Sequence, residues 1–204
     1  MYIANSGKLY AIGQCFLPIN EERMKNLNIS EVIINPVFNH LFLTIEHPEG
    51  QYQYIGDALG RDCMITRFKD GWMRMYDGDG MLNEDWYTWG ADVLAPFDGV
   101  VKSIFINPIT NNPGTFTPGR ASSIVFARED GVLVTYAHVM DISVEEGDII
   151  TTGQVVAKAG NNGYSRNPHI HVGAWIGDTP LQIRFDLQRM GTQMKEFGER
   201  LYLC

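Results

Sequence analysis

The chain has 204 residues, of which 45% are hydrophobic, so it is long enough for one full-sized core and is not expected to be disordered. Its 16 basic and 24 acidic residues give a formal net charge of −8, which argues against electrostatic capture of nucleic acid or anionic lipid. No apolar run approaches the roughly 20 residues needed to span a bilayer, and no signal peptide is recognisable, so we expect no membrane insertion.

The composition favours a sheet-rich body over a helical bundle. The chain contains 21 glycines and nine prolines together with abundant Val, Ile, Tyr and Trp, which is typical of strands joined by tight turns. Its three cysteines, Cys15, Cys63 and Cys204, are odd in number and share no metal-binding spacing, so a disulfide framework is not expected, although one pair remains open.

The first part of the chain predicts one helix and two strands. Charged residues and helix formers between turn signals indicate a short helix from Ile19 to Ser30. Apolar pieces from Glu31 to Glu46 predict two strands that are broken at Asn35-Pro36, and a turn follows at 47–50. We treat residues 1–45 as an N-terminal extension packed on the main domain.

The next segment predicts a long insertion. Residues 51–57 alternate between polar and apolar side chains, whereas 58–89 are rich in Gly, Asp and aromatic residues without clear periodicity, which indicates a surface loop. Its aromatic side chains could line a substrate groove or form a small satellite core, and the sequence leaves both open; they are Trp72, Trp86, Tyr87 and Trp89.

From Gly90 onward, strand signals recur at short intervals and are punctuated by glycines, which predicts a mainly β fold, either an antiparallel barrel or a sandwich. Residues 181–204 contain a predicted C-terminal helix interrupted by glycines. We therefore expect one domain over 46–180, with the 58–89 loop inserted in it and a helical tail at 181–204.

The histidines carry the chemical signal. The chain has only five, and His169-Ile170-His171 lies in a segment that reads as a strand, so the side chains of His169 and His171 point to the same face about 7 Å apart. Two imidazoles on one face can share a metal ion and its water. The alternative is that one of them is a buried structural histidine.

Three blocks of sequence resemble one known family. NPHIHVGAW is similar to the Pro-His-x-His motif of the lysostaphin-like, or LytM-type, zinc endopeptidases. Upstream, LVTYAHV followed by VEEGDIITTGQVV and GNNG resembles that family's Tyr-x-His segment, hairpin and glycine loop, and GADVLAPFDGVV resembles its first strand pair. The blocks occur in the family's order over residues 90–175, which implies the family's duplicated-hybrid-motif fold.

The resemblance implies roles for three histidines. His171 would bind Zn²⁺, while His138 and His169 would flank the catalytic water. This is chemically coherent, because a zinc ion held by three protein ligands keeps one position open for water, lowers the pKa of that water to about 7 and works best beside a group that handles protons.

The remaining zinc ligands in the family are a histidine and an aspartate upstream of the first strand pair. Residues 78–90 resemble an insertion found in a subgroup of the family, which makes Asp57 the expected carboxylate and His47 the expected histidine. If His47 is not a ligand, His40 or Gln51 would lie nearest, and the site would be degenerate.

Three functions follow in order of preference. The first is a zinc metalloendopeptidase that cleaves peptidoglycan stem or cross-bridge peptides, which the resemblance places in the cell envelope, the periplasm or outside the cell. The second is an inactive module of the same fold that binds cell wall or activates a partner hydrolase. The third is a phosphocarrier domain, since the glycine-punctuated hairpin is similar to that of sugar-transport phosphotransfer proteins. Oligomeric state and the bond that is cut stay open.

Overall fold

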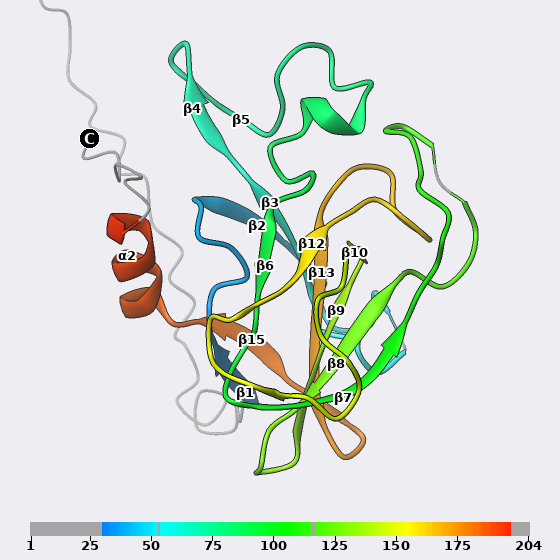
Figure 1. Ribbon diagram of the computed structural model, residues 1–204, viewed down its shortest axis with the longest axis vertical. Coiled ribbons are helices and arrows are strands. Elements are labelled where there is room, and N and C mark those ends of the chain that lie inside the picture. The colour runs from blue at the N-terminus through cyan, green and yellow to red at the C-terminus, as the bar shows by residue number, and fades with distance from the viewer. Residues whose placement is uncertain (1–29, 53, 116, 197–204) are drawn as a thin grey trace, which may run out of the picture.

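The computed structural model describes residues 30–196 except 53 and 116 (Figure 1). The helix predicted from Ile19 to Ser30 therefore lies outside the described residues, apart from its last position, as do Cys15 and Cys204. Cys63 is buried and not in a disulfide. No helix in the described part of the chain is long and apolar enough to cross a bilayer.

Most strands form one large antiparallel sheet. Its order is β11-β7-β8-β9-β13-β3-β2, and β14 pairs with β13. The strands are β2 (Phe42–Glu46), β3 (Arg61–Ile65), β7 (Gly99–Phe105), β8 (Ser123–Ala127), β9 (Val132–Ala137), β11 (Ile149–Ile150), β13 (Ile170–Ile176) and β14 (Thr179–Pro180).

Smaller sheets complete the body. The second has the order β10-β12-β6, and two further pairs are the parallel β1-β15 and the hairpin β4-β5. The large sheet has free edges at β11 and β2 among the described residues, so the mainly β prediction is confirmed as a sandwich-like arrangement and not a closed barrel. These elements are β1 (Glu31–Ile34), β4 (Arg67–Lys69), β5 (Trp72–Arg74), the 3₁₀ helix η1 (Asn83–Asp85), β6 (Asp92–Leu94), β10 (Val139–Met140), β12 (Val155–Ala159), β15 (Gln182–Phe185) and α2 (Leu187–Glu196).

The core lies between the large sheet and the three-stranded sheet, which overlap in Figure 1. On β9, Val134 and Tyr136 are fully buried and belong to the same cluster as Val156 and Ala159 of β12. Because side chains alternate along a strand, Thr135 and Ala137 point to the opposite face of the large sheet. That opposite face is therefore available for a functional site.

The predicted 58–89 surface loop is wrong in one part, because it contains β3, an interior strand of the large sheet. Cys63 and Ile65 on this strand are completely buried. The strand has only five residues, and turn signals lie on both sides of it. The sequence therefore shows no clear alternation of polar and apolar side chains there.

The two ends of the predicted domain also differ from expectation. The two strands expected between Glu31 and Glu46 are confirmed as β1 and β2, but they pair with β15 and β3 and so belong to the body instead of forming an extension. The predicted C-terminal helix is confirmed as α2, which begins at Leu187, but Gln182–Phe185 of the predicted tail forms β15 against β1.

Candidate metal and catalytic site

His171 lies on the face of the large sheet that points away from the core. Its neighbours Ile170 and Val172 are buried in the core cluster, so His171 projects to the other side of β13. Antiparallel pairing sets His171 directly opposite Asp62 of β3. Side chains of directly opposed residues share a face, and here Nδ1 of His171 lies 3.0 Å from Oδ1 of Asp62.

His47 joins this pair from the next strand. It follows the last residue of β2, and its backbone N–H donates to the carbonyl of Gly60, which extends the β2-β3 pairing by one residue. Its Nε2 lies 3.4 Å from Oδ2 of Asp62, and its ring stacks on that of His171 with the centroids 5.1 Å apart. Pairing of the adjacent strands β2, β3 and β13 thus brings the side chains of His47, Asp62 and His171 together.

Asp57, the expected carboxylate, does not belong to this group of three. Its Oδ1 lies 3.3 Å from Nε2 of His171, the ring nitrogen on the far side from Asp62, and its side chain is 46% exposed. The same Nε2 lies 2.9 Å from the carbonyl oxygen of Gly56 and donates to it. Asp57 therefore contacts Nε2 of His171, whereas Asp62 contacts Nδ1 on the opposite side of the ring.

Asp62 was missed because its position depends on strand pairing. Asp62 falls inside the predicted 58–89 loop, where a carboxylate after Gly60-Arg61 resembles an ordinary turn residue. The pairing of β3 with β13 brings together residues 109 positions apart in the chain. No local signal in the sequence marks Asp62, because both the strand β3 and its register with β13 depend on tertiary pairing.

The charges within the group are strongly coupled. Burial alone would raise the pKa of Asp62, but hydrogen bonds from His171 and His47 hold it well below its usual range. Burial opposes protonation of His171, yet its hydrogen bonds with Asp57 and Asp62 raise its pKa from 6.5 to about 9. An ionised carboxylate with a cationic imidazole beside it is an arrangement in which a divalent cation can replace the proton.

His138 occupies the corner where the chain passes from the large sheet to the second sheet. It lies between β9 and β10 and has a φ of 66°, a left-handed conformation that is uncommon for a residue other than glycine. Such strained positions are concentrated at functional sites. Its Nδ1 donates to the carbonyl oxygen of Asn162 over 2.8 Å, which leaves Nε2 without a proton in the neutral ring.

His169 lies beside His138 and is held in the same way. The two ring centroids are 4.4 Å apart, and Nδ1 of His169 donates to the carbonyl oxygen of Asn167 over 2.8 Å. Its Nε2 lies 3.7 Å from Oδ1 of Asp62, which places it next to the group of three. The prediction that His169 and His171 share a face is consistent with this geometry.

Both of these histidines favour the neutral form. Burial, followed by the neighbouring His169, lowers the pKa of His138 well below 6.5. Burial also lowers the pKa of His169, although Asp62 opposes the shift. Neutral imidazoles with an unprotonated Nε2 can accept a proton near pH 7.

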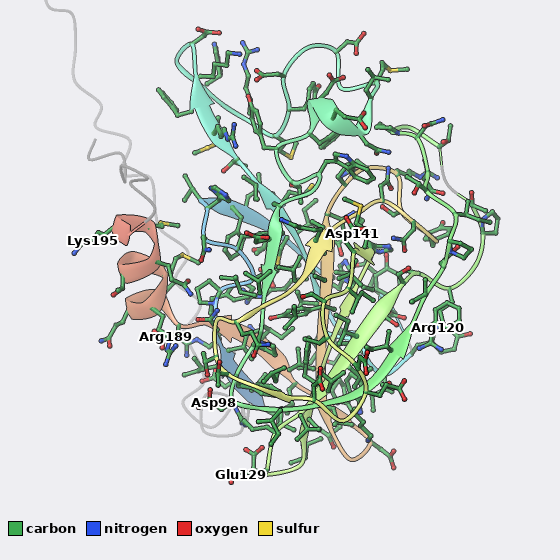
Figure 2. The ribbon with its side chains drawn as sticks, in the orientation of Figure 1. Asp98, Arg120, Glu129, Asp141, Arg189 and Lys195 are labelled. Carbon is green, nitrogen blue, oxygen red and sulfur yellow. The ribbon has the colours of Figure 1, made fainter. Side chains whose placement is uncertain are left out.

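The histidines lie in a cleft of about 600 Å³ on the outer face of the large sheet. Thr135 and Ala137 of β9 are among the residues that line it, as their position opposite the core requires. Arg120 also lines it and, in Figure 2, lies on the other side of the molecule from helix α2. The aromatic lining residues are Tyr52, Tyr164 and Trp175.

The aromatic residues that the sequence offered for a groove lie elsewhere. Trp86 packs against Tyr76 with the ring centroids 4.9 Å apart, and its indole N–H donates to the carbonyl of Gly80. Tyr87 packs against the core and Arg67 lies over its ring. Of the two readings left open, Trp86 matches a satellite core within the insertion, whereas Tyr87 packs against the main core.

The donor group fits a zinc ion. One ligand atom from each of His47, Asp62 and His171 lies within 4.8 Å of the others. Two ligands at zinc-binding distance in a tetrahedron are about 3.3 Å apart, and the two contacts to Asp62 measure 3.4 Å and 3.0 Å. Two histidine nitrogens and a carboxylate oxygen are donors that zinc prefers, and three protein ligands leave one position for water.

Gly173 in β13 allows the turn at Gly56, whose carbonyl contacts His171, to pack closely against the strand. A Cβ on Gly173 would lie 1.6 Å from the carbonyl oxygen of Gly56. We therefore expect Gly173→Ala to displace the Gly56 turn, destabilise the fold by about 2 kcal/mol or more and weaken zinc binding. Thermal unfolding and zinc titration of the variant measure the two effects.

Gly191→Ala on helix α2 is the matched control, since a Cβ there meets nothing within 4 Å. It should leave zinc binding unchanged and keep or raise the melting temperature, because alanine favours a helix over glycine. A Gly173→Ala protein with the zinc affinity and melting temperature of the unaltered chain would contradict the role given to this close approach.

Comparison with known proteins confirms the family resemblance. Residues 86–183 match the model of peptidase family M23, a span that contains the whole of the 90–175 segment whose motifs suggested it. No curated protein sequence matches the chain.

The chain is also similar to several solved structures. One is the catalytic domain, in mutant form, of the prophage-encoded M23 protein EnpA from Enterococcus faecalis, with 18% identity over 72% of this chain and 92% of that chain and a TM-score of 0.48. Another is the catalytic domain of the antimicrobial peptidase lysostaphin from Staphylococcus simulans, with 19% identity over 68% and 86% of the two chains and a TM-score of 0.43. A third is the M23 metalloprotease pseudoalterin from the deep sea, with 15% identity over 74% of each chain and a TM-score of 0.44.

Proposed function

We propose that the chain is a zinc metalloendopeptidase that hydrolyses peptide bonds in peptidoglycan stem or cross-bridge peptides, because residues 86–183 match the model of peptidase family M23. The observation that carries this proposal is the His47-Asp62-His171 group beside two neutral histidines in one cleft. Such a substrate places the activity in the cell envelope or outside the cell.

We assign the zinc ligands to His47, Asp62 and His171, so Asp62 replaces Asp57 in the ligand set expected from the sequence. Bound zinc would supply a water of lowered pKa and polarise the scissile carbonyl. The Gly56 carbonyl and Asp57 hold the outer nitrogen of His171, and this fixes the ring with Nδ1 toward Asp62. His47 is oriented by stacking on His171 and by contact with Tyr52.

His138 and His169 act on the proton of the attacking water. Each ring donates Nδ1–H to a backbone carbonyl, so each offers an unprotonated Nε2. Their lowered pKa values keep both rings neutral near pH 7, so that each Nε2 is free of a proton before the reaction. Once protonated, the same nitrogens can donate hydrogen bonds to the oxyanion of the tetrahedral intermediate or a proton to the leaving amine.

The variant His171→Ala tests the proposal. Removal of this ligand should abolish both zinc binding and hydrolysis, because only two protein ligands remain. Zinc per chain is measured by elemental analysis, and hydrolysis by the release of new amino groups from purified peptidoglycan.

His40→Ala is the matched control, since His40 lies outside the donor group and should keep both properties. Hydrolysis at the full rate by His171→Ala would rule the mechanism out. A zinc-free chain that binds peptidoglycan without cutting it would instead support the inactive module of the same fold.

A further inference from the structure

A chain of buried polar side chains connects the 78–90 loop to His169. Asn83 of η1 is 6% exposed, and Asn161 and Ser165, which precede β13, are 1% and 2% exposed. Buried amides and hydroxyls are costly unless they are hydrogen-bonded. These side chains contact one another in sequence and end at the catalytic imidazole.

The hydrogen bonds of this chain run in one direction. The side-chain nitrogen of Asn83 donates to the carbonyl oxygen of Asn111 over 2.8 Å, so the amide oxygen of Asn83 faces Asn161 and accepts from its nitrogen over 2.9 Å. The amide oxygen of Asn161 then accepts from the hydroxyl of Ser165 over 2.8 Å. The Ser165 hydroxyl oxygen also lies 2.9 Å from the carbonyl oxygen of Asn167 and 3.3 Å from Nδ1 of His169, and this Nδ1 donates to the same carbonyl over 2.8 Å.

This direction matters because it starts at a backbone carbonyl, which can only accept. Each amide orientation is dictated by the one before it, so the Ser165 hydroxyl is held against the His169 ring, whose proton is kept on Nδ1 by the Asn167 carbonyl. Nε2 is therefore the unprotonated nitrogen, and it is the nitrogen 3.7 Å from Asp62.

The same network secures the loop that carries His138's partner. The side-chain nitrogen of Asn111 donates to the carbonyls of Gly163 and Ser165, both over 2.8 Å. Asn162, which directly precedes Gly163, accepts from His138 with its backbone carbonyl and donates from its side chain to the carbonyl of Val139. The 160–167 loop is thus held on both sides by buried hydrogen bonds.

We propose that Asn83 is a positioning residue for His169, acting through Asn161 and Ser165. The 78–90 loop, which carries Asn83, thereby helps to hold the His169 ring in its catalytic position. This proposal rests on the proposed peptidase function. Without the Asn83 side chain, Asn161 loses its 2.9 Å acceptor and keeps only a 3.4 Å contact to the carbonyl of Asn111. The amide of Asn161 is then free to turn, and the restraint on Ser165 and His169 is lost.

The experiment compares kinetics of the zinc-loaded full chain with those of Asn83→Ala, Ser165→Ala and the double variant. We expect each single variant to lower kcat by about 10- to 100-fold, with KM and zinc content within about twofold, because the imidazole and not the substrate or metal contacts is disturbed. The double variant should match Ser165→Ala within about twofold, since both substitutions break one chain. Asn112→Ala, at the exposed neighbour of Asn111, should behave like the unaltered chain.

A second measurement does not depend on activity. Long-range ¹H–¹⁵N spectra of the histidine rings report which nitrogen of His169 carries the proton. The proton should stay on Nδ1 in every variant, because the Asn167 carbonyl accepts it, whereas the ring ¹⁵N shifts of His169 should move in Asn83→Ala and Ser165→Ala and stay unchanged in Asn112→Ala.

A lowered melting temperature in Asn83→Ala, with kcat and the ring ¹⁵N shifts of His169 both unchanged, would overturn the proposal and leave Asn83 as a structural residue only. If the unaltered chain hydrolyses no peptide, the peptidase function fails, and the comparison of ring shifts alone decides whether Asn83 positions His169.

Discussion

Asp62→Asn is expected to lower zinc affinity by more than about 100-fold and to remove nearly all activity, because the effect of losing a ligand exceeds the 10- to 100-fold cost of losing a residue that supports one. Asp62 contacts both His47 and His171, and its carboxylate is the only charge of the three-residue group that can neutralise a divalent cation. The amide keeps the size of the side chain but not its negative charge.

Asp57→Asn is the matched variant, because the two aspartates lie on opposite sides of the same imidazole. Asp57 and the Gly56 carbonyl both contact Nε2 of His171. Loss of the Asp57 carboxylate should therefore weaken zinc binding by no more than about 10- to 100-fold. Competitive titration with a chelating indicator measures both affinities. The opposite ranking, with Asp57→Asn the more damaging, would restore Asp57 as the ligand.

His138→Asn is expected to lower kcat by about 10²- to 10⁴-fold, the usual contribution of a positioned acid or base, and to keep its zinc. His138 lies outside the metal group, its ring centroid 6.5 Å from that of His171, so the ligands are not disturbed. Asparagine is preferred to alanine here because it tolerates the left-handed conformation at φ 66°. Zinc content and peptidoglycan hydrolysis are measured on the same sample.

His169→Ala should show the same separation of activity from metal content, since its ring lies against both His138 and Asp62. His138→Asn that loses zinc along with activity would mean that His138 supports the metal group. His138→Asn or His169→Ala with full activity would remove that histidine from the mechanism.

The insertion illustrates how local patterns mislead. Residues 58–89 carry glycines, aspartates and aromatic residues that favour a loop, and most of the segment has little regular structure. Yet Arg61–Ile65 is a strand between β2 and β13, because burying Cys63 and Ile65 against the core outweighs a weak local preference. A short strand in a turn-rich setting is recognisable only from its partners.

The sequence by itself predicted the sheet-rich body, the family resemblance and the candidate histidines His138, His169 and His171, because strand alternation and closely spaced motifs are local properties. The matched family segment, 86–183, does not reach His47, Asp57 or Asp62. Only the tertiary structure decided which carboxylate faces Nδ1 of His171, because that depends on the register of β3 against β13. A register shift of one residue would turn Asp62 into the core.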